Sequence, residues 1–190
     1  MYKNKKVIYI YGPSGAGSTT IGNLFCEKHD YKLIDTDFYF HFDPVSGEAD
    51  KKYYENPQLR MNELINDLKE ADKNVVITGS FWNWECNYEE LISYIDYFIR
   101  VSLDPKIRYD RLLKREKERF EKSNPEKFKR IIEDDFKWSM SYETGGLNQR
   151  SLKSNIYLEN KYNIKPILID NINSVDESVR TIEEGIKSFH

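Results

Sequence analysis

The chain has 190 residues, a mass of 22.7 kDa and a formal net charge of −3. This length suits one domain, and an aromatic content of 14% supplies enough core-forming side chains to exclude intrinsic disorder. The mildly negative charge disfavours nucleic acid as a partner, and no apolar run approaches the roughly 20 residues that span a bilayer.

Two further features bear on the cellular compartment. The apolar stretch that follows the basic N-terminus lasts five residues, which is too short for a signal peptide. Cys26 and Cys86 lie too far apart in the sequence to indicate a zinc site, and two cysteines do not make a disulfide scaffold. We therefore expect a reduced, cytoplasmic protein without a membrane partner, either a monomer or a homodimer.

Short apolar runs alternate with helical patterns along the whole chain. Continuous runs rich in β-branched and aromatic residues are typical of strands that are buried on both faces of a parallel sheet. Strands are predicted at residues 7–11, 33–34, 75–79, 97–101 and 167–169. Helices are predicted at residues 21–28, from 57, at 91–95, 105–122, 125–142 and 148–162, and from 174. This alternation predicts an α/β fold, a five-stranded parallel sheet with helices on both faces.

Two stretches interrupt the alternation, residues 38–73 and 120–147. In an open α/β sheet the ligand lies outside the carboxyl ends of the strands. Insertions at that edge would cover the ligand. We therefore expect a single domain over residues 1–190, with a substrate-side insertion at 38–73, largely a loop as far as residue 55, and a lid region at 120–147.

The strongest motif lies between the first predicted strand and the first predicted helix, Gly12-Pro13-Ser14-Gly15-Ala16-Gly17-Ser18-Thr19. Its glycines let backbone amides wrap around phosphate oxygens, and the helix N-terminus adds the positive end of its dipole. The motif predicts an ATP-binding loop in which Thr19 holds Mg²⁺; the alternative is a glycine-rich turn that merely starts a helix. The predicted ATP-binding residues are Gly12, Ser14, Gly15, Ala16, Gly17, Ser18, Thr19 and Thr20.

The loop departs from the phosphate-loop pattern G-x-x-x-x-G-K-[ST] at one position, where Ser18 replaces the lysine. That lysine normally reaches the β- and γ-phosphates. Its loss weakens the stabilisation of charge on the transferring group. Either another cation takes its place, or the site binds nucleotide and turns over poorly.

Two carboxylates, Asp35 and Asp37, follow the second predicted strand. Asp35 is predicted to support the metal, and Asp37 to bind the acceptor or to accept the proton of its hydroxyl. The alternative is a polar turn in which these carboxylates only cap backbone amides. The position after a phosphate loop, at the carboxyl end of a strand, favours the functional interpretation.

The predicted helix after the fourth strand carries a stripe of arginines at helical spacing, Arg108, Arg111, Arg115 and Arg119. Tyr109, Leu113 and Phe120 lie on a neighbouring arc and are expected to face the core. Arginine suits bidentate contacts to phosphate. We predict that Arg111, Arg115 and Arg119 balance charge on the transferring group; the alternative is a solvated face that pairs with nearby glutamates.

Three weaker features complete the candidate site. Gly79 ends the third strand and opens the aromatic segment 79–84, whose rings either stack on a base or roof the core. Arg60 either holds an acceptor phosphate or is an ordinary surface arginine. Residues 144–150 either form a lid hinge that delivers Arg150 or a plain turn between helices. The predicted substrate-binding residues are Asp35, Asp37, Arg60, Gly79 and Arg150.

In this order, the phosphate loop, the paired carboxylates and the arginine-rich helix resemble a small-molecule P-loop kinase over residues 5 to about 188. The chain is similar to the adenylate kinase and shikimate kinase group, in which ATP donates a phosphoryl group to a nucleoside monophosphate or a small metabolite. The loop together with residues 35–39, 111–116 and 144–147 resembles a bacterial branch of adenylate kinase-related ATPases that also tends to lack the loop lysine. The resemblance implies a mobile lid, ATP on the loop and Mg²⁺ near Thr19 and Asp35.

The chain departs from adenylate kinases after the third strand. Those enzymes carry an Asp-Gly-Phe-Pro-Arg run there, whereas this chain has Thr78-Gly79-Ser80-Phe81-Trp82. The arginine that would grip the acceptor phosphate is absent from that run, which argues against adenylate kinase activity proper.

The leading expectation is a magnesium- and ATP-dependent kinase, a phosphotransferase, whose small-molecule acceptor is a nucleotide or nucleoside. A second hypothesis is a nucleotide-binding regulatory protein with little or no catalysis, which Ser18 favours. A third is end-phosphorylation of nucleic acid, which the net charge of −3 opposes.

Overall fold

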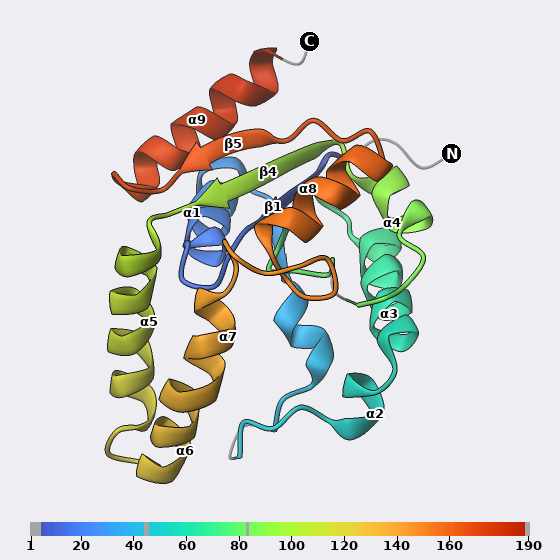
Figure 1. Cartoon of the computed structure of the whole chain (residues 1–190). Coiled ribbons are helices and arrows are strands. Elements are labelled where there is room, and N and C mark those ends of the chain that lie inside the picture. Colours follow the sequence, from blue (N-terminus) through green and yellow to red (C-terminus); the bar gives the residue numbers. More distant parts are fainter. Residues whose placement is uncertain (1–4, 44–45, 83, 189–190) are drawn as a thin grey trace.

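A five-stranded parallel sheet forms the centre of the computed structural model, which describes residues 5–43, 46–82 and 84–188 (Figure 1). The strand order is β2-β3-β1-β4-β5, so the first strand lies in the middle. The strands are β1 (Val7–Tyr11), β2 (Lys32–Asp35), β3 (Val75–Thr78), β4 (Tyr97–Ser102) and β5 (Ile167–Asp170). The predicted fold class and the five predicted strands are confirmed.

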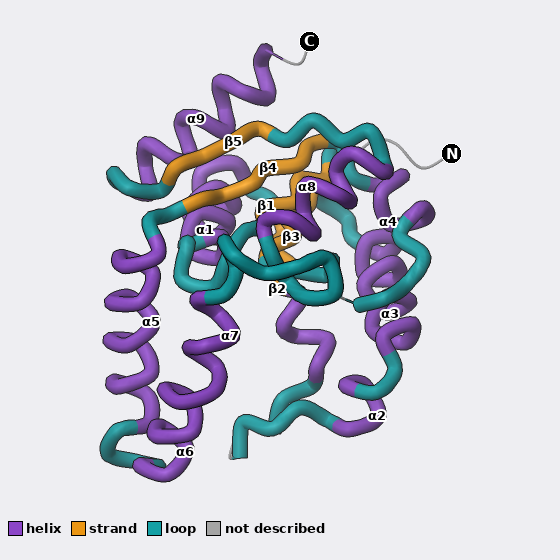
Figure 2. Tube along the Cα trace, in the orientation of Figure 1, coloured by secondary structure: helices purple, strands orange, loops and turns teal. Residues whose placement is uncertain are grey.

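Helices cover both faces of this sheet (Figure 2). The helical elements are α1 (Ser18–His29), η1 (Thr36–Phe40), α2 (Lys51–Tyr54), α3 (Pro57–Glu70), α4 (Glu89–Tyr94), α5 (Pro105–Phe120), α6 (Pro125–Arg130), the π-helical turn η2 (Ile131–Asp135), α7 (Phe136–Met140), α8 (Leu152–Lys161) and α9 (Val175–Ser188). α1 and α9 pack on one face, and α3, α4 and α8 on the other. In the described part of the chain, no helix combines the length and the hydropathy needed to cross a bilayer.

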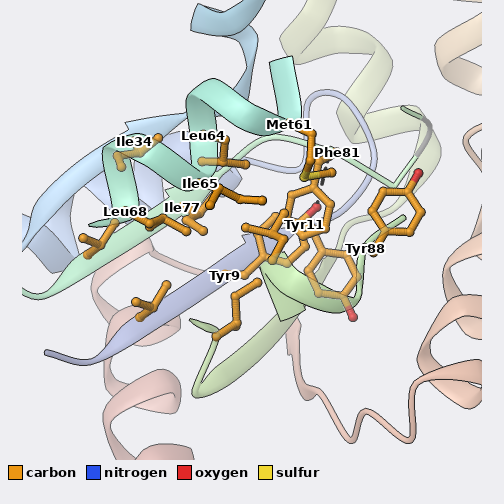
Figure 3. Packing of buried hydrophobic residues seen from close by; sticks show 14 of the residues in the cluster. Tyr9, Tyr11, Ile34, Met61, Leu64, Ile65, Leu68, Ile77, Phe81 and Tyr88 are labelled. Atoms are coloured by element: carbon orange, nitrogen blue, oxygen red, sulfur yellow. Dashed lines mark hydrogen bonds between the residues drawn. The ribbon is translucent and has the colours of Figure 1, made fainter. Parts of the chain in front are cut away.

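The central strand β1 explains why the core has two halves. Successive side chains of a strand point to opposite faces. Tyr9 and Tyr11 join the cluster under α3 and α4, shown in Figure 3, whereas Ile8 and Ile10 join the cluster under α1 and α9. Both sets are buried, so the apolar run that predicted this strand reflects a core on each side of the sheet.

The aromatic segment after β3 contributes mainly to the first of these clusters. Phe81 and Trp82 are buried, and the Phe81 ring stacks on Tyr9 with 4.2 Å between the ring centroids. Trp84 is buried as well, but one side of it lines a cavity described below. The rings therefore roof the core; Asn83 lies outside the described residues.

The helix α5 buries a different face from the one that the sequence suggested. Its inner side carries Arg108, Leu112 and Glu116, whereas Tyr109 is 37% exposed. The prediction that Tyr109, Leu113 and Phe120 face the main core is therefore wrong. The reason is that α5 packs against the phosphate loop, α6 and α7 rather than on the sheet, and Leu113 and Phe120 only border a small separate cluster there.

The first predicted insertion contains more helix than the loop expected as far as residue 55, whereas the helix predicted at 125–142 is present as three consecutive helical elements. Residues 38–55 include the end of η1 and all of α2. In the region 120–147, α6, η2 and α7 form one helical path with a π-helical turn in its middle. Figure 1 shows α5, α6 and α7 extending together from one end of the sheet.

Candidate active site

The phosphate loop takes the conformation that its glycines permit. Gly17, the N-cap of α1, has a φ of 93°, a value that L side chains rarely adopt. A Cβ at Gly17 would also lie 2.6 Å from Nδ2 of the Asn171 side chain. Gly17 has no side chain with which to cap α1, so the first-turn amides of α1 remain available to an anion.

A hydrogen-bonded group joins the loop to the ends of two strands. The Thr19 hydroxyl donates to Oδ2 of Asp35 over 2.9 Å, and the Thr78 hydroxyl donates to the same oxygen over 3.1 Å. The other carboxylate oxygen accepts from the backbone amide of Asp37. Gly79, with a φ of 89°, lets the end of β3 approach this turn, where a Cβ would collide with Thr36. The structure thus brings Thr19 and Asp35 together.

These residues fit a magnesium ion. Mg²⁺ is usually held by one or two carboxylates together with substrate phosphates and waters, rather than by an all-protein cage. The pair of Thr19 and Asp35 beside the open amides of α1 is such a partial set. The described residues contain no cluster of three or more histidine, cysteine, aspartate or glutamate side chains placed to hold a metal.

A cavity of about 460 Å³ opens over the phosphate loop, and we call it the loop cavity. Asp37 and three arginines, Arg111, Arg115 and Arg150, bring charge to its walls. The remaining wall is formed by Pro13, Ser14, Gly15, Gly17, Ser18, Thr19, Thr20, Gly79, Leu112, Asn171 and Val175. The loop residues predicted to bind ATP thus gather around this space; Gly12 and Ala16 lie in the loop without lining it.

A second cavity of about 830 Å³ adjoins the first, and we call it the aromatic cavity. It is lined by aromatic rings, acidic side chains and two arginines. Its lining residues are Ser14, Asp37, Phe40, Phe42, Tyr54, Glu55, Pro57, Arg60, Ser80, Trp84, Glu85, Asp135, Trp138, Ser139 and Arg150. The two predicted insertions and the aromatic segment after β3 all contribute to its wall.

Asp37 lines both cavities. Its side chain is open to them, while protein walls on its other sides displace much of the surrounding water. This loss of hydration, followed by repulsion from Asp35, raises the pKa of the Asp37 carboxyl, and the nearby Arg150 and Arg115 act in the opposite direction.

Arg60 is buried in the wall of the aromatic cavity rather than lying on the surface. Its guanidinium lies 4.4 Å from the centroid of the Phe40 ring and 5.0 Å from that of Trp84. Nη1 donates to the carbonyls of Tyr53 and Tyr54, whereas Nε is buried without a partner. Burial lowers the pKa of Arg60.

The arginine stripe of α5 divides along the helix. Arg111 and Arg115 line the loop cavity, and Nη1 of Arg111 lies 3.8 Å from the position that a Cβ on Gly17 would occupy. Arg119 lies one turn further along, is 59% exposed, and is placed 3.7 Å from Glu116 rather than along the cavity. Arg108 turns away from the other three into the protein interior.

Two residues that position the loop were not among the predicted site residues. Arg108 is fully buried and donates to the Ser14 carbonyl over 3.1 Å and to both carboxylate oxygens of Glu143. Asn171, just after β5, donates to the Ala16 carbonyl over 2.7 Å. The arginine stripe offered a signal for Arg108, whereas a single asparagine after a strand offers none.

A phosphate loop between β1 and α1, with paired carboxylates after β2 and a parallel sheet of order 2-3-1-4-5, defines a protein of the P-loop class. Residues 8–133 match the model of the AAA_18 family, described as an AAA domain, and the chain belongs to this family. Together with the relatives described next, this places it in the P-loop superfamily of nucleotide and small-molecule kinases.

Among curated proteins, the chain is similar to a cytidylate kinase of Archaeoglobus fulgidus, with 29% identity over 116 residues. That match covers 57% of this chain and 61% of the cytidylate kinase, less than two thirds of its length. The chain is also 28% identical over 153 residues to the protein YqaC of Bacillus subtilis, which covers 77% of this chain and 78% of YqaC.

Solved structures support the fold. A shikimate kinase of Bacteroides thetaiotaomicron has a TM-score of 0.57 at 18% identity, covering 96% of this chain and 98% of the other. A deoxyadenosine kinase of M. mycoides with bound dCTP has a TM-score of 0.55 at 15% identity, covering 96% and 99%.

Proposed function

We propose that the protein is an ATP-dependent kinase of a small molecule that carries a planar ring, a nucleoside or a nucleotide. The observation that carries this proposal is that two cavities meet at Asp37. One of them surrounds a phosphate loop, and the other is lined by aromatic rings. A phosphoryl group passing from a donor in the first cavity to an acceptor in the second would cross beside this carboxylate.

The donor would lie in the loop cavity. Backbone amides of residues 15–19 would hold its phosphates, and Thr20, in the first turn of α1, would flank them. Thr19 and Asp35 would hold Mg²⁺, which supplies charge neutralisation at the β- and γ-phosphates when it is bound. Arg111 and Val175 line this cavity without lining the aromatic cavity.

The acceptor would lie in the aromatic cavity. Exposed rings of Trp138, Phe42 and Tyr54 line it, and aromatic side chains stack well on a base. The relatives include kinases named for cytidylate and for shikimate, and the aromatic lining favours a base over a sugar acid. Arg60 would hold an acceptor phosphate, and the backbone of Gly79 would border the reacting groups.

The reaction would be an in-line phosphoryl transfer. A hydroxyl oxygen of a nucleoside, or a phosphate oxygen of a nucleotide, forms a bond to the γ-phosphorus, the bond from that phosphorus to the β–γ bridging oxygen breaks, and ADP leaves with the electron pair. With a hydroxyl acceptor, Asp37 takes the hydroxyl proton. Arg111 and Arg115 would balance charge on the transferring group, and Arg119 would do so only if α5 moved toward the loop. Catalysis is then mostly positioning and electrostatics.

The test measures ADP release by the purified chain with ATP and Mg²⁺ against a panel of acceptors. The panel contains ribo- and deoxyribonucleosides, their monophosphates, shikimate and gluconate. We expect acceptor-dependent ADP release with a nucleoside or a nucleoside monophosphate. Release with shikimate or gluconate alone would contradict the assignment of the aromatic cavity.

A second candidate function is nucleotide binding with little or no catalysis, and Ser18 is the observation that favours it. Tight binding of ATP without ADP release for any acceptor on the panel would support this function. The carboxylate of Asp37 between the two cavities favours the kinase, because a protein that only binds ATP needs no proton acceptor there.

A further inference from the structure

The guanidinium of Arg150 lies on the phosphate loop, in which Ser18 replaces the usual lysine. We propose that Arg150 supplies the positive charge that position 18 of the phosphate loop lacks, and that it does so as a fixed part of the site rather than as part of a closing lid. This inference rests on the proposed function, because it concerns the phosphates of a nucleotide on the loop.

The first argument is where the guanidinium lies. The loop cavity and the aromatic cavity share three lining residues among those that the structure describes, and these are Ser14, Asp37 and Arg150. The γ-phosphoryl group must cross that boundary during transfer. Arg150 is therefore the one cation among the described lining residues that borders both the donor and the acceptor side.

The second argument is what Arg150 contacts. Nη2 donates to the carbonyl of Gly12, and Nη1 lies 3.4 Å from the hydroxyl of Ser14, so the guanidinium lies on the loop itself. Its Nε is buried without a hydrogen-bond partner. A charged guanidinium bonds phosphate oxygens more strongly than neutral carbonyls and hydroxyls. Exchanging the Nη1 and Nη2 contacts with the loop for contacts with phosphate oxygens is therefore favourable.

The third argument is that Arg150 is held in place. The next residue, Ser151, begins a capping box with Ser154 that opens α8. Glu159 in the same helix accepts from the Tyr11 hydroxyl over 2.6 Å and pairs with Arg100, which ties α8 to β1 and β4. Because α8 is tied to the sheet, Arg150 reaches the loop without any movement of the lid region.

The arginines of α5 are less suited to this task. The Arg115 side chain is 54% exposed and pairs with Glu116, and neither Arg111 nor Arg115 lines the aromatic cavity. The exposed arginines of α5 are suited to stabilising charge that develops during phosphoryl transfer. A lysine in the phosphate loop, in contrast, also stabilises bound ATP before transfer. Arg150 and the α5 arginines should therefore affect different measurements.

The test compares equilibrium binding of ATP, ADP and AMP, with Mg²⁺, by calorimetry. The variants are Arg150→Gln, which keeps hydrogen-bond donors and deletes the charge, and Arg150→Lys, which keeps the charge. A third carries Arg150→Gln together with Ser18→Lys, and Arg180→Gln on the exposed face of α9 is the matched control. Melting temperatures show whether each variant is folded.

We expect Arg150→Gln to weaken ATP and ADP by about 10- to 100-fold, the usual range for losing a charge-assisted contact. AMP should change by less than about threefold, because it has no β- or γ-phosphate. Arg150→Lys and the double variant should recover most of the affinity for ATP and ADP, and Arg180→Gln should bind as the parent does. Recovery by a lysine at position 18 would not follow if Arg150 only shaped the loop.

Several outcomes would overturn the inference. These are unchanged ATP and ADP affinity in Arg150→Gln, an equal loss for AMP, or no recovery in a folded double variant. If Arg150→Gln does not fold, Arg150→Lys decides, because the inference requires it to keep ADP affinity within about tenfold of the parent. The binding comparison needs no acceptor. Absence of transfer by the parent protein would therefore reject the proposed kinase, while the nucleotide affinities would still decide whether Arg150 supplies the missing charge.

Discussion

The hydroxyl of Thr19 donates to Oδ2 of Asp35 over 2.9 Å, which joins the first turn of α1 to the end of β2. If this pair holds Mg²⁺, Thr19→Ala should weaken ATP binding by about tenfold with Mg²⁺ and by much less with a chelator. Titration calorimetry under both conditions measures the difference, with Thr181→Ala on α9 as control. An equal loss in both conditions would remove Thr19 from the metal site.

Asp37 carries the second prediction. Asp37→Asn keeps the shape of the side chain and removes its capacity to take a proton. We expect the rate of phosphoryl transfer to fall by about 10²–10⁴, the range for a general base, while ATP affinity stays within about threefold. Single-turnover kinetics with the best nucleoside acceptor of the panel, which reacts through a hydroxyl, measure the chemical step. Unimpaired transfer would show that the carboxylate takes no part in it.

The wall of the aromatic cavity carries the third prediction. Trp138 is 47% exposed and lines that cavity without lining the loop cavity. Trp138→Ala should raise the KM of a nucleoside acceptor by about 10-fold, because stacking on a base contributes about 1–3 kcal/mol, and should leave ATP affinity nearly unchanged. Trp138→Phe should recover most of the loss. An unchanged acceptor KM in the alanine variant would move the acceptor to another surface.

The fourth prediction concerns stability. Arg108 is fully buried, and its partner Glu143 is 33% exposed in the side chain. Glu143→Gln leaves the buried charge with only neutral acceptors, so the free energy of unfolding should fall by about 2–3 kcal/mol. Urea denaturation measures it, with Glu126→Gln on the surface of α6 as control. A change no larger than that of the control would mean that the backbone carbonyls alone satisfy Arg108.

The sequence predicted the strands, the phosphate loop and the paired carboxylates because each depends on neighbouring residues. β1 is a continuous apolar run, and Thr19 follows the glycines of the phosphate loop at a fixed spacing. Local spacing also placed Asp35 and Asp37 at the carboxyl end of a strand, which in a parallel sheet is the edge where the loop lies.

The rest of the site depends on contacts between distant parts of the chain. Arg150 meets Ser14 across 136 positions, and Asn171 meets Ala16 across 155. The break at residues 144–150 marked Arg150 as a candidate but did not show that it meets the phosphate loop, and no local pattern marks Asn171. The prediction of the buried face of α5 was wrong for the same reason. Helical spacing shows which residues share a face of a helix but not which neighbour that face meets, and here Arg108 rather than Tyr109 turns inward.

The π-helical turn η2 has a consequence for selectivity. A π turn carries one residue more than the α-helical turn it replaces, and residues of an α-helix are about 100° apart around its axis. Asp135, Trp138 and Ser139, at or beyond this turn, all line the aromatic cavity. Deleting one residue within Ile131–Asp135 would rotate α7 by roughly that angle and turn a different set of side chains toward the acceptor. A single-codon deletion in η2 would then reshape the wall of the aromatic cavity, while Thr19 and Asp35 lie in other elements of the fold.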